Sequence, residues 1–321
     1  MAEDGRNALR FRSVMRIRVL GTAAGGGFPQ WNCNCHNCRE ARTNPAGAHP
    51  RTQSSIAISA DGERWFLLNA SPDLAAQIAV FPPLQPTRFP IRGTPIEAVL
   101  LTNADLDHTL GLLSLRENPT LSIYASPETR SDLTEGSAPL SVLGKFCTMR
   151  WFPVSLTEEP LLQADGSASL LSYMAFPVPG KPPKFARRST AQHGAGDSVG
   201  YRIRDTTTGG TLIYAPDVLD LSGGLATRLD DCDLLFFDGT FWSETEMSDR
   251  KINDVTARDM GHLPISGSCG SLEGLKTVSR PSRIYIHINN TNPILLETSP
   301  ERAAVRAAGW TVGEDGMEFQ V

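Results

Sequence analysis

Residues 102–112, with the sequence TNADLDHTLGL, form the most informative motif of this 321-residue chain. They follow residues 97–102, a short apolar and β-branched run that predicts a buried strand. Loops at the ends of such strands often carry ligands in α/β folds. Asp107 and His108 therefore form a candidate pair of metal ligands, in a turn that we expect to precede a helix. The alternative is an ordinary strand-end loop with solvated aspartates.

The motif resembles the sequence His-x-His-x-Asp-His of the metallo-β-lactamase superfamily. In that superfamily the first two histidines hold one metal ion, and the Asp and the last His hold a second. Asn103 and Asp105 stand where the first two histidines would be. A neutral Asn is a poor transition-metal ligand, and a lone carboxylate does not replace two imidazoles. We expect the first metal site to be weak or empty, which argues against two-metal hydrolysis.

Other strand ends occur in the order that the superfamily requires. Residues 66–73 resemble an early strand and loop with a structural Asp. Residues 212–217 resemble the strand whose Asp bridges two metal ions, here Asp217. Residues 283–290 resemble the late strand that ends in the last His, here His287. Residues 175–180 match a segment that normally contributes a further first-site His, and they contain none.

The resulting candidate site consists of Asp107, His108 and His287, with Asp217 as a fourth ligand or a base. Two imidazoles and one carboxylate leave open coordination positions. This donor set suits a non-haem Fe(II) ion that binds O2 and substrate together, although Zn(II), Mn(II) or Co(II) could also occupy it.

Cys33, Cys35 and Cys38 form a second candidate metal site, because three closely spaced thiols suit one soft cation. Structural Zn(II) is the preferred interpretation, with an iron–sulfur cluster, redox thiols and disulfides as alternatives. His36 could supply the fourth ligand. Asn290 is the other candidate, because it resembles the position that completes a similar cysteine knuckle in phosphodiesterases of the superfamily.

The remaining cysteines, Cys147, Cys232 and Cys269, are scattered, and we expect them to be small buried apolar residues.

A closer resemblance, to the PqqB family of coenzyme PQQ biosynthesis proteins, extends over most of residues 15–321. The segments that carry it are residues 19–35, 51–55, 69–73, 102–105, 260–265 and 287–293. The resemblance implies an αββα sandwich and a role in making pyrroloquinoline quinone (PQQ) from a Glu and a Tyr of a precursor peptide. It also implies iron- and O2-dependent hydroxylation of the tyrosine-derived ring, or, in an older view, export of the product. A zinc hydrolase of a pathway intermediate and a non-catalytic carrier of the quinone are the alternatives.

The expected substrate is a small Glu–Tyr compound, and other proteins of the pathway are possible partners. His262 resembles an acid/base histidine of superfamily phosphodiesterases, so His262 and Asp217 are the candidate catalytic residues for proton transfer. A helix-cap or core histidine is the alternative for His262. Lys184, Arg187 and Arg188 lie in a Pro/Gly-rich segment that could cover the site and bind carboxylates, or simply form a solvated loop.

The composition fits a cytoplasmic enzyme. The formal net charge of −5, without a basic stripe, argues against a nucleic-acid partner. We find no apolar run of about 20 residues that could cross a membrane and no signal-peptide core. Residues 1–14 form a polar extension, and residues 15–321 are expected to be one metallo-β-lactamase-like domain that carries the cysteine knuckle. The oligomeric state stays open.

The hydrophobic pattern predicts the following elements. Strands are expected at residues 15–20, 55–59, 65–69, 98–102, 122–125, 198–204, 211–214, 233–238, 283–287 and 311–321. Helices are expected at residues 73–80, 127–133, 217–230, 254–260, 270–278 and 300–308.

Overall fold

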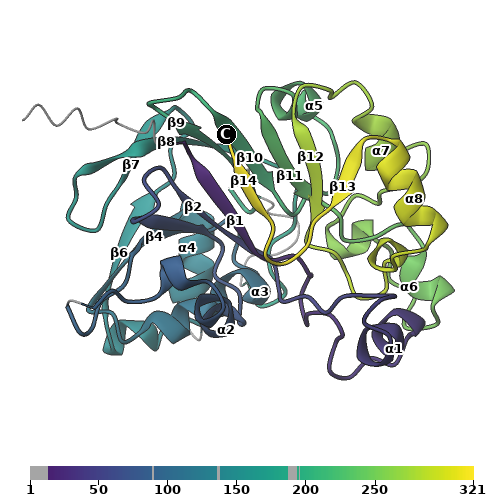
Figure 1. Ribbon diagram of the computed structural model, residues 1–321, viewed down its shortest axis with the longest axis horizontal. Helices are drawn as coiled ribbons and strands as arrows, with labels where there is room; N and C mark the ends of the chain where they lie inside the picture. Colours follow the sequence, from purple (N-terminus) through teal and green to yellow (C-terminus); the bar gives the residue numbers. More distant parts are fainter. Residues whose placement is uncertain (1–13, 89, 136–137, 187–193, 195) are drawn as a thin grey trace, which may run out of the picture.

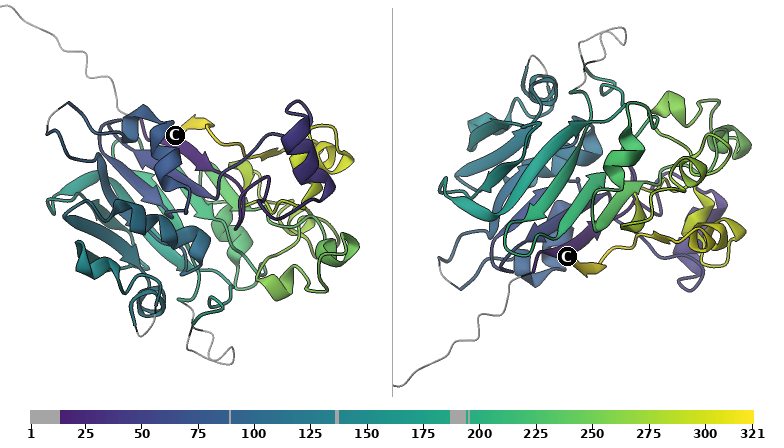
Figure 2. Two further views of the ribbon diagram at one scale, coloured as in Figure 1. Left: turned by 90° about the horizontal axis from the view of Figure 1, so that it is seen from below. Right: turned by 90° about the horizontal axis from the view of Figure 1, so that it is seen from above.

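Two β-sheets packed face to face form the centre of the molecule, and helices cover their outer faces (Figures 1 and 2). The computed structural model describes residues 14–88, 90–135, 138–186, 194 and 196–321. Within these residues each sheet has seven strands. This architecture confirms the predicted αββα sandwich. Most of the predicted N-terminal extension, and both Arg187 and Arg188, lie outside the described residues.

The first sheet has the strand order β14-β1-β2-β3-β4-β5-β6, in which β3 to β6 run parallel. Its strands are β1 (Arg16–Gly21), β2 (Ser55–Ser59), β3 (Trp65–Leu68), β4 (Ile96–Leu100), β5 (Thr120–Ala125), β6 (Thr148–Pro153) and β14 (Glu318–Gln320).

The second sheet has the order β13-β12-β11-β10-β9-β8-β7, in which β10 to β13 run parallel. Its strands are β7 (Glu159–Leu162), β8 (Ala168–Pro177), β9 (Val199–Asp205), β10 (Thr211–Ala215), β11 (Leu234–Asp238), β12 (Ser282–Ile286) and β13 (Trp310–Val312).

Two groups of helices bury the outer faces of the sheets. Against the first sheet pack α2 (Leu74–Ala79), α4 (Pro127–Thr134) and the 3-10 helix η2 (Leu110–Leu115). Against the second sheet pack α1 (His36–Thr43), α5 (Leu225–Leu229) and α8 (Pro300–Ala307). The other helices are α3 (Leu106–Thr109), α6 (Glu246–Asp249), α7 (Ser271–Gly274), η1 (Pro82–Leu84), η3 (Leu143–Lys145), η5 (Arg258–Met260) and η6 (Pro293–Leu295). Every described helix is too short to cross a membrane as an apolar span.

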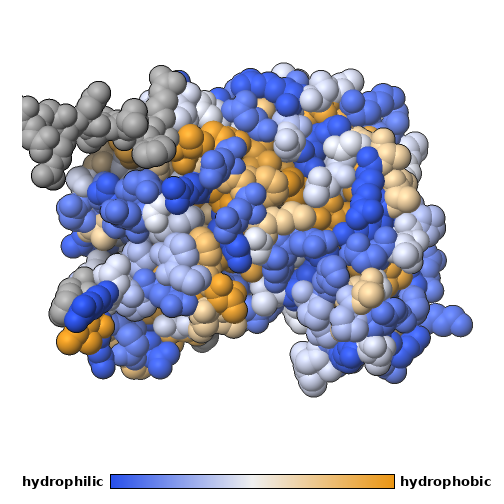
Figure 3. Space-filling view, in the orientation of Figure 1, coloured by the Kyte–Doolittle hydropathy of each residue, from blue (hydrophilic) through white to orange (hydrophobic). Residues whose placement is uncertain are grey.

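The alternation of side chains along each central strand explains the layers. In β11, Leu234 and Phe236 belong to the core between the sheets, whereas Leu235 and Phe237 belong to the core beneath the outer helices. All four side chains are buried. A strand that is covered on both faces therefore has a continuous apolar sequence. On the surface, apolar residues are visible in the band between the two sheets, and polar residues cover most of the rest of this face (Figure 3).

Most of the predicted strands are confirmed to within two residues, and the helices α2, α4 and α8 are also confirmed. The predicted strand at residues 311–321 is wrong, because this segment forms two strands in different sheets. β13 pairs with β12, and β14 pairs with β1. Gly316 lies between them at φ +91°, a backbone conformation that favours glycine.

The predicted helix at residues 217–230 is also wrong at its start, because the helix α5 begins only at Leu225. The backbone N–H of Val218 donates to the carboxylate of Asp238 at 2.8 Å, and the N–H of Leu219 donates to the carbonyl of Pro179. Gly223 and Gly224 then adopt positive φ angles. The predicted helices at residues 254–260 and 270–278 shrink to η5 and α7. The edge strands β6 and β7, the strand β8 and the helix α1 were not predicted.

A buried cluster of opposite charges joins residues before and after α8 to the loop before β2. Arg51 and Arg302 have side chains that are 1 % and 4 % exposed. Nη2 of Arg302 lies 2.7 Å from Oε1 of Glu314 and 3.0 Å from Oε1 of Glu297. Burial raises the pKa of Glu314, but Arg302 and Arg51 outweigh burial and hold the pKa below its ordinary value. Glu314 is therefore a counter-ion that two buried guanidinium groups share.

We expect Glu314→Gln to lower the free energy of unfolding by roughly 1–3 kcal/mol, because it leaves buried positive charge less compensated. Glu318→Gln is the matched control: Glu318 pairs with Arg18 at 2.8 Å on the surface, where we expect a change of less than about 0.5 kcal/mol. Urea denaturation of both variants measures the difference. Equal midpoints for the two variants would contradict the buried role of Glu314.

Candidate metal centre

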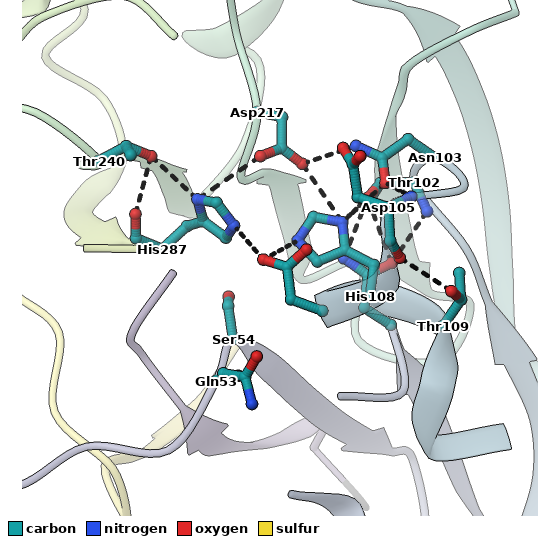
Figure 4. A network of polar contacts seen from close by, with 12 residues as sticks. Gln53, Ser54, Thr102, Asn103, Asp105, His108, Thr109, Asp217, Thr240 and His287 are labelled. Carbon is teal, nitrogen blue, oxygen red and sulfur yellow. Dashed lines mark hydrogen bonds and ion pairs between the residues drawn. The ribbon is translucent and has the colours of Figure 1, made fainter. Parts of the chain in front are cut away.

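The carboxyl ends of strands from both sheets meet at one edge of the sandwich, and the candidate ligands lie there (Figure 4). Asp107 and His108 follow β4, and His287 follows β12. Both Asp107 and His108 lie inside α3, so the predicted turn before a helix is in fact the first turn of a short helix. Asn69 follows β3, and its Oδ1 accepts a hydrogen bond from the backbone N–H of Thr102 at 2.9 Å. This contact fixes the start of the loop between β4 and α3.

The structure brings Asp107, His108 and His287 together. One ligand atom from each lies within 4.8 Å of the others. Nε2 of His287 lies 3.0 Å from Oδ2 of Asp107, and Nε2 of His108 lies 4.0 Å from the same oxygen. The two imidazole rings meet edge to face at 5.0 Å. This donor set of two nitrogens and one oxygen is the predicted one.

The Nε2 atom of His108 is buried and has no hydrogen-bond partner among the residues that the structure describes. Such an atom is costly in a folded protein unless a ligand uses it. His287 adds strain, because its backbone lies in the left-handed region at φ 59°. An unpartnered imidazole nitrogen beside a carboxylate and a second imidazole fits a bound transition-metal ion.

Asp217 lies on the Nδ1 side of both candidate ligand histidines, His108 and His287. Its Oδ2 is 3.3 Å from Nδ1 of His108, and its Oδ1 is 3.5 Å from Nδ1 of His287. In this geometry Asp217 orients both imidazole rings through their Nδ1 atoms and leaves their Nε2 atoms to face Asp107. Asp217, His262 and His287 also form a second group whose ligand atoms lie within 4.8 Å of one another. The role of Asp217 as a fourth ligand or a base stays a prediction.

Opposite charges around each titratable group change the pKa values of the site. Burial lowers the pKa of His287, but Asp217 and Asp107 outweigh burial and raise this pKa to about 10. Burial raises the pKa of Asp107, but His108 and His287 outweigh burial and lower it. For Asp105, burial and the nearby Asp107 and Asp217 raise the pKa to about 7. A metal ion at this site would displace the proton of His287.

His262 lies at the site, next to His287. The two rings stack at 5.3 Å. Nδ1 of His262 lies 2.8 Å from Oδ2 of Asp238. Asp238 and Thr240 are site residues that the sequence interpretation missed. Oγ1 of Thr240 lies 2.9 Å from Nδ1 of His287, so it supports that ligand. A strand-end carboxylate at position 238, like that of Asp217, was the signal that could have identified Asp238.

Of the predicted cationic cover, only Lys184 is described, and its side chain is exposed. Arg187 and Arg188 lie outside the described residues, so the predicted cover stays a prediction.

The three cysteines of the knuckle surround Asn290. The amide Nδ2 of Asn290 lies 3.1, 3.7 and 3.3 Å from the sulfur atoms of Cys33, Cys35 and Cys38. Asn290 comes just after His287, so the knuckle adjoins the metal centre. His36 is exposed on α1, whereas Asn290 is buried among the sulfur atoms, so Asn290 is the better placed of the two candidates. The atom that faces the sulfur atoms is the amide nitrogen, which only donates hydrogen bonds, and Asn290 could bind zinc only through Oδ1. The fourth ligand therefore stays a prediction.

All six cysteines are free. A hydrogen bond from Cys38 is the main cause that lowers the pKa of Cys35 to about 5, and the same contact raises the pKa of Cys38. One thiolate is thus favoured in the knuckle even without a metal, as a thiolate-binding cation requires. The prediction that the other cysteines are buried holds for Cys147 and Cys232 but is wrong for Cys269, which is exposed in the loop before α7.

A buried carboxylate supports the segment that follows His287. Glu246 accepts a hydrogen bond from the N–H of Trp242 at 2.6 Å and contacts the hydroxyl of Thr291. Asn289 donates to the same hydroxyl at 2.6 Å. Burial is the largest influence on Glu246 and raises its pKa to about 7. Glu246 therefore remains partly protonated near neutral pH.

Comparison with known proteins gives consistent results. Residues 64–288 match the model of a β-lactamase superfamily domain. The chain is 45% identical over 308 residues to "Coenzyme PQQ synthesis protein B" of Pseudomonas aeruginosa, covering 96% of this chain and 100% of that protein. It is 42% identical to the protein of the same name from Nitrosococcus oceani, covering 95% and 99%. A crystal structure of Zn(2+)-bound PqqB from Methylobacterium extorquens matches with TM-score 0.85 and 38% identity, covering 95% of this chain and 100% of that one.

We expect Glu246→Gln to change how stability depends on pH. The ordinary pKa of a Glu carboxyl is 4.5. Well below that pH, the carboxyl of Glu246 is neutral in both the folded and the unfolded wild type. Between that pH and about 7 the unfolded state ionises first, so the wild type loses stability as the pH rises. The variant lacks this loss and should gain about 2–3 kcal/mol relative to the wild type between pH 4.5 and 8.

Urea denaturation of Glu246→Gln at several pH values measures the effect, with the exposed Glu273→Gln as the control. A constant difference between wild type and Glu246→Gln would mean that the pKa of Glu246 is the same in the folded and unfolded states, and would contradict the raised pKa.

We expect Cys38→Ser to lose one equivalent of bound zinc per chain, because the buried thiol is one of three in the knuckle. Cys269→Ser is the control, because Cys269 is a lone exposed cysteine. Elemental analysis after dialysis against a weak chelator measures the zinc content. Equal zinc contents of the two variants would argue against a zinc site at the knuckle.

Proposed function

This chain belongs to the coenzyme PQQ synthesis protein B family of the β-lactamase superfamily, and from that premise we propose that it acts in PQQ biosynthesis as a one-metal, Fe(II)- and O2-dependent hydroxylase. The proposed substrate is a Glu–Tyr compound that derives from a precursor peptide, and the proposed product carries oxygen on the tyrosine-derived ring. The observation that carries the proposal is the unpartnered Nε2 of His108 beside Asp107 and His287.

The residues at the former first metal site support a single metal ion. The side chain of Asn103 is occupied by hydrogen bonds to His108 and Asp217. Asp105 offers one carboxylate where the motif has an imidazole, and residues 175–180 lack a histidine. Hydrolysis by paired ions needs ligands for both ions, and this chain has lost the histidines of one.

Asp107, His108 and His287 would hold Fe(II), and the ion, when bound, would supply the activation of O2. Thr240 and Asp217 hold the Nδ1 sides of the imidazoles and so orient the ligands. Asp238 holds His262 by Nδ1, which favours the tautomer whose Nε2 would accept the phenolic proton of the substrate. Loss of that proton makes the aromatic ring electron-rich and favours oxygen insertion beside the hydroxyl.

Zn(II) in the related Methylobacterium structure keeps a zinc-dependent hydrolase of a pathway intermediate as the second candidate. Other proteins of the pathway are proposed partners that deliver the substrate or take up the product. A carrier of the quinone is disfavoured, because a carrier has no need of an open metal site.

We expect the metal-free protein, reconstituted with Fe(II) under anaerobic conditions, to add oxygen to a Glu–Tyr substrate when O2 and a reductant such as ascorbate are supplied. Each hydroxylation consumes one O2 and two electrons and releases water. Mass spectrometry with ¹⁸O₂ should show that the added oxygen comes from O2. His108→Ala should abolish the product, because it removes a ligand, whereas His36→Ala should react like the wild type, because His36 is exposed on α1.

Oxygen gain with Fe(II) but not with Zn(II) supports the oxygenase. Hydrolysis of the substrate by the zinc form, without oxygen gain by either form, would replace the oxygenase with the hydrolase.

A further inference from the structure

We propose that Asn103 is a positioning residue for the metal centre: it holds the His108 ring in the tautomer that leaves Nε2 free for a metal ion. This inference rests on the proposed metal site but not on the reaction proposed for it. Asn103 is 1 % exposed and stands at a position where the superfamily motif has a metal-binding histidine.

The orientation of the Asn103 amide follows from two partners that each play only one role. Oδ1 of Asn103 lies 3.1 Å from the backbone N–H of Asp105, which can only donate. Nδ2 of Asn103 lies 3.0 Å from Oδ2 of Asp217, and a carboxylate can only accept. The opposite orientation would place two donors together at Asp105 and two acceptors together at Asp217. The amide oxygen therefore faces His108 (Figure 4).

This orientation decides where His108 carries its hydrogen. Nδ1 of His108 lies 2.9 Å from Oδ1 of Asn103, which only accepts hydrogen bonds. Nδ1 must therefore carry the hydrogen, and in the neutral ring Nε2 then has a free lone pair. On the other side of the ring, the nearest charged oxygen, Oδ2 of Asp107, is 4.0 Å from Nε2, too far for a hydrogen bond. The tautomer is set from the Nδ1 side.

Asparagine suits this place better than its close relatives. Its amide offers an acceptor to His108 and Asp105 and a donor to Asp217 at the same time. An Asp at position 103 would keep the acceptor but would face Asp217 with a second negative charge. A Leu of similar size would offer neither. Position 103 holds a ligand of the first metal site in the superfamily motif. In this chain the residue at that position instead supports His108, the candidate ligand of the second site.

Two further oxygens lie near Nδ1 of His108 and are the competing explanation. Oγ1 of Thr102 is 3.2 Å away, and Oδ2 of Asp217 is 3.3 Å away. Both are longer contacts than that of Asn103. Oγ1 of Thr102 also exchanges hydrogen bonds with the side chain of Asn69. Asn103 makes the shortest contact to Nδ1 and is the one that ties His108 to Asp217.

The direct test is ¹⁵N NMR of the metal-free protein with labelled histidine at pH 8, where the six histidines give few signals and His108→Ala identifies those of His108. We expect Nδ1 of His108 to be protonated in the wild type. Asn103→Asp should keep this tautomer, because it keeps the acceptor, whereas Asn103→Leu should shift the ring to the Nε2–H tautomer. Thr102→Val is the control and should leave the tautomer unchanged.

The second measurement is the affinity for Zn(II) as a probe ion, by competition with a chelator. We expect Asn103→Leu to bind the active-site ion about 10–100-fold more weakly than the wild type, as is typical when the partner of a ligand histidine is lost. Asn103→Asp should bind more tightly than Asn103→Leu. Zinc at the knuckle is measured separately and should not change.

An Nε2–H tautomer in the wild type overturns the proposal, and so does a tautomer that changes in Thr102→Val. If Asn103→Leu does not fold, the tautomers of the wild type and of Thr102→Val can still overturn the proposal. Wild-type tautomer and affinity in a folded Asn103→Leu would also overturn it. Absence of oxygen transfer in a protein with the expected tautomer would contradict only the proposed function.

Discussion

Buried opposite charges at the edge where both sheets present their strand ends are the constraint on which the site depends. Asp217 and Asp238 are almost fully buried, and each contacts an imidazole. A buried charge without a partner costs several kcal/mol, so these groups keep their positions only as a set. The sandwich provides the rigid support, because β4, β11 and β12 are packed on both faces and cannot shift without disturbing two cores.

The same constraint explains the shape of the segment after β12. His287 turns into the site with a left-handed backbone, a conformation that has an energetic cost for a residue with a side chain. Neighbouring polar contacts compensate for that cost. Thr240 contacts both the ring and the carbonyl of His287, and the side chain of Asn292 donates to the carbonyl of Gly239 at 2.9 Å. Asn37 on α1 donates to the carbonyls of Asn290 and Asn292, so the cysteine knuckle braces this segment from outside.

The proposed use of one metal ion instead of two also changes what the remaining residues would do. Where relatives of the superfamily place histidines for a first ion, this chain has Asn103, whose amide connects His108 with Asp217. His262 and Asp238 lie on the other flank of the site and add a potential proton acceptor. A single ion with supporting residues on both sides suits chemistry in which substrate and O2 share the open coordination positions, as the proposed hydroxylation requires.

Local patterns in the sequence were sufficient for most of the strand positions, although β6, β7 and β8 were missed. Together with the family resemblance, they also predicted the sandwich and the grouping of Asp107, His108 and His287. Apolar strand cores and strand-end ligands depend on residues close together in the chain, and the order of the motifs resembled a known superfamily. The same patterns failed at residues 217–230 and 311–321, because distant backbone partners and glycine turns override local preference there.

The supporting contacts could be known only from the folded chain. Asn103 meets Asp217, Asp238 meets His262, and Asn290 meets three cysteines across sequence separations of 114, 24 and more than 250 residues. Hydrogen bonds depend on distances and angles between such partners, and no local pattern records them. Local residue patterns thus indicated which side chains could bind a metal ion, whereas the three-dimensional packing of the two sheets decided which atoms of those side chains remain free to do so.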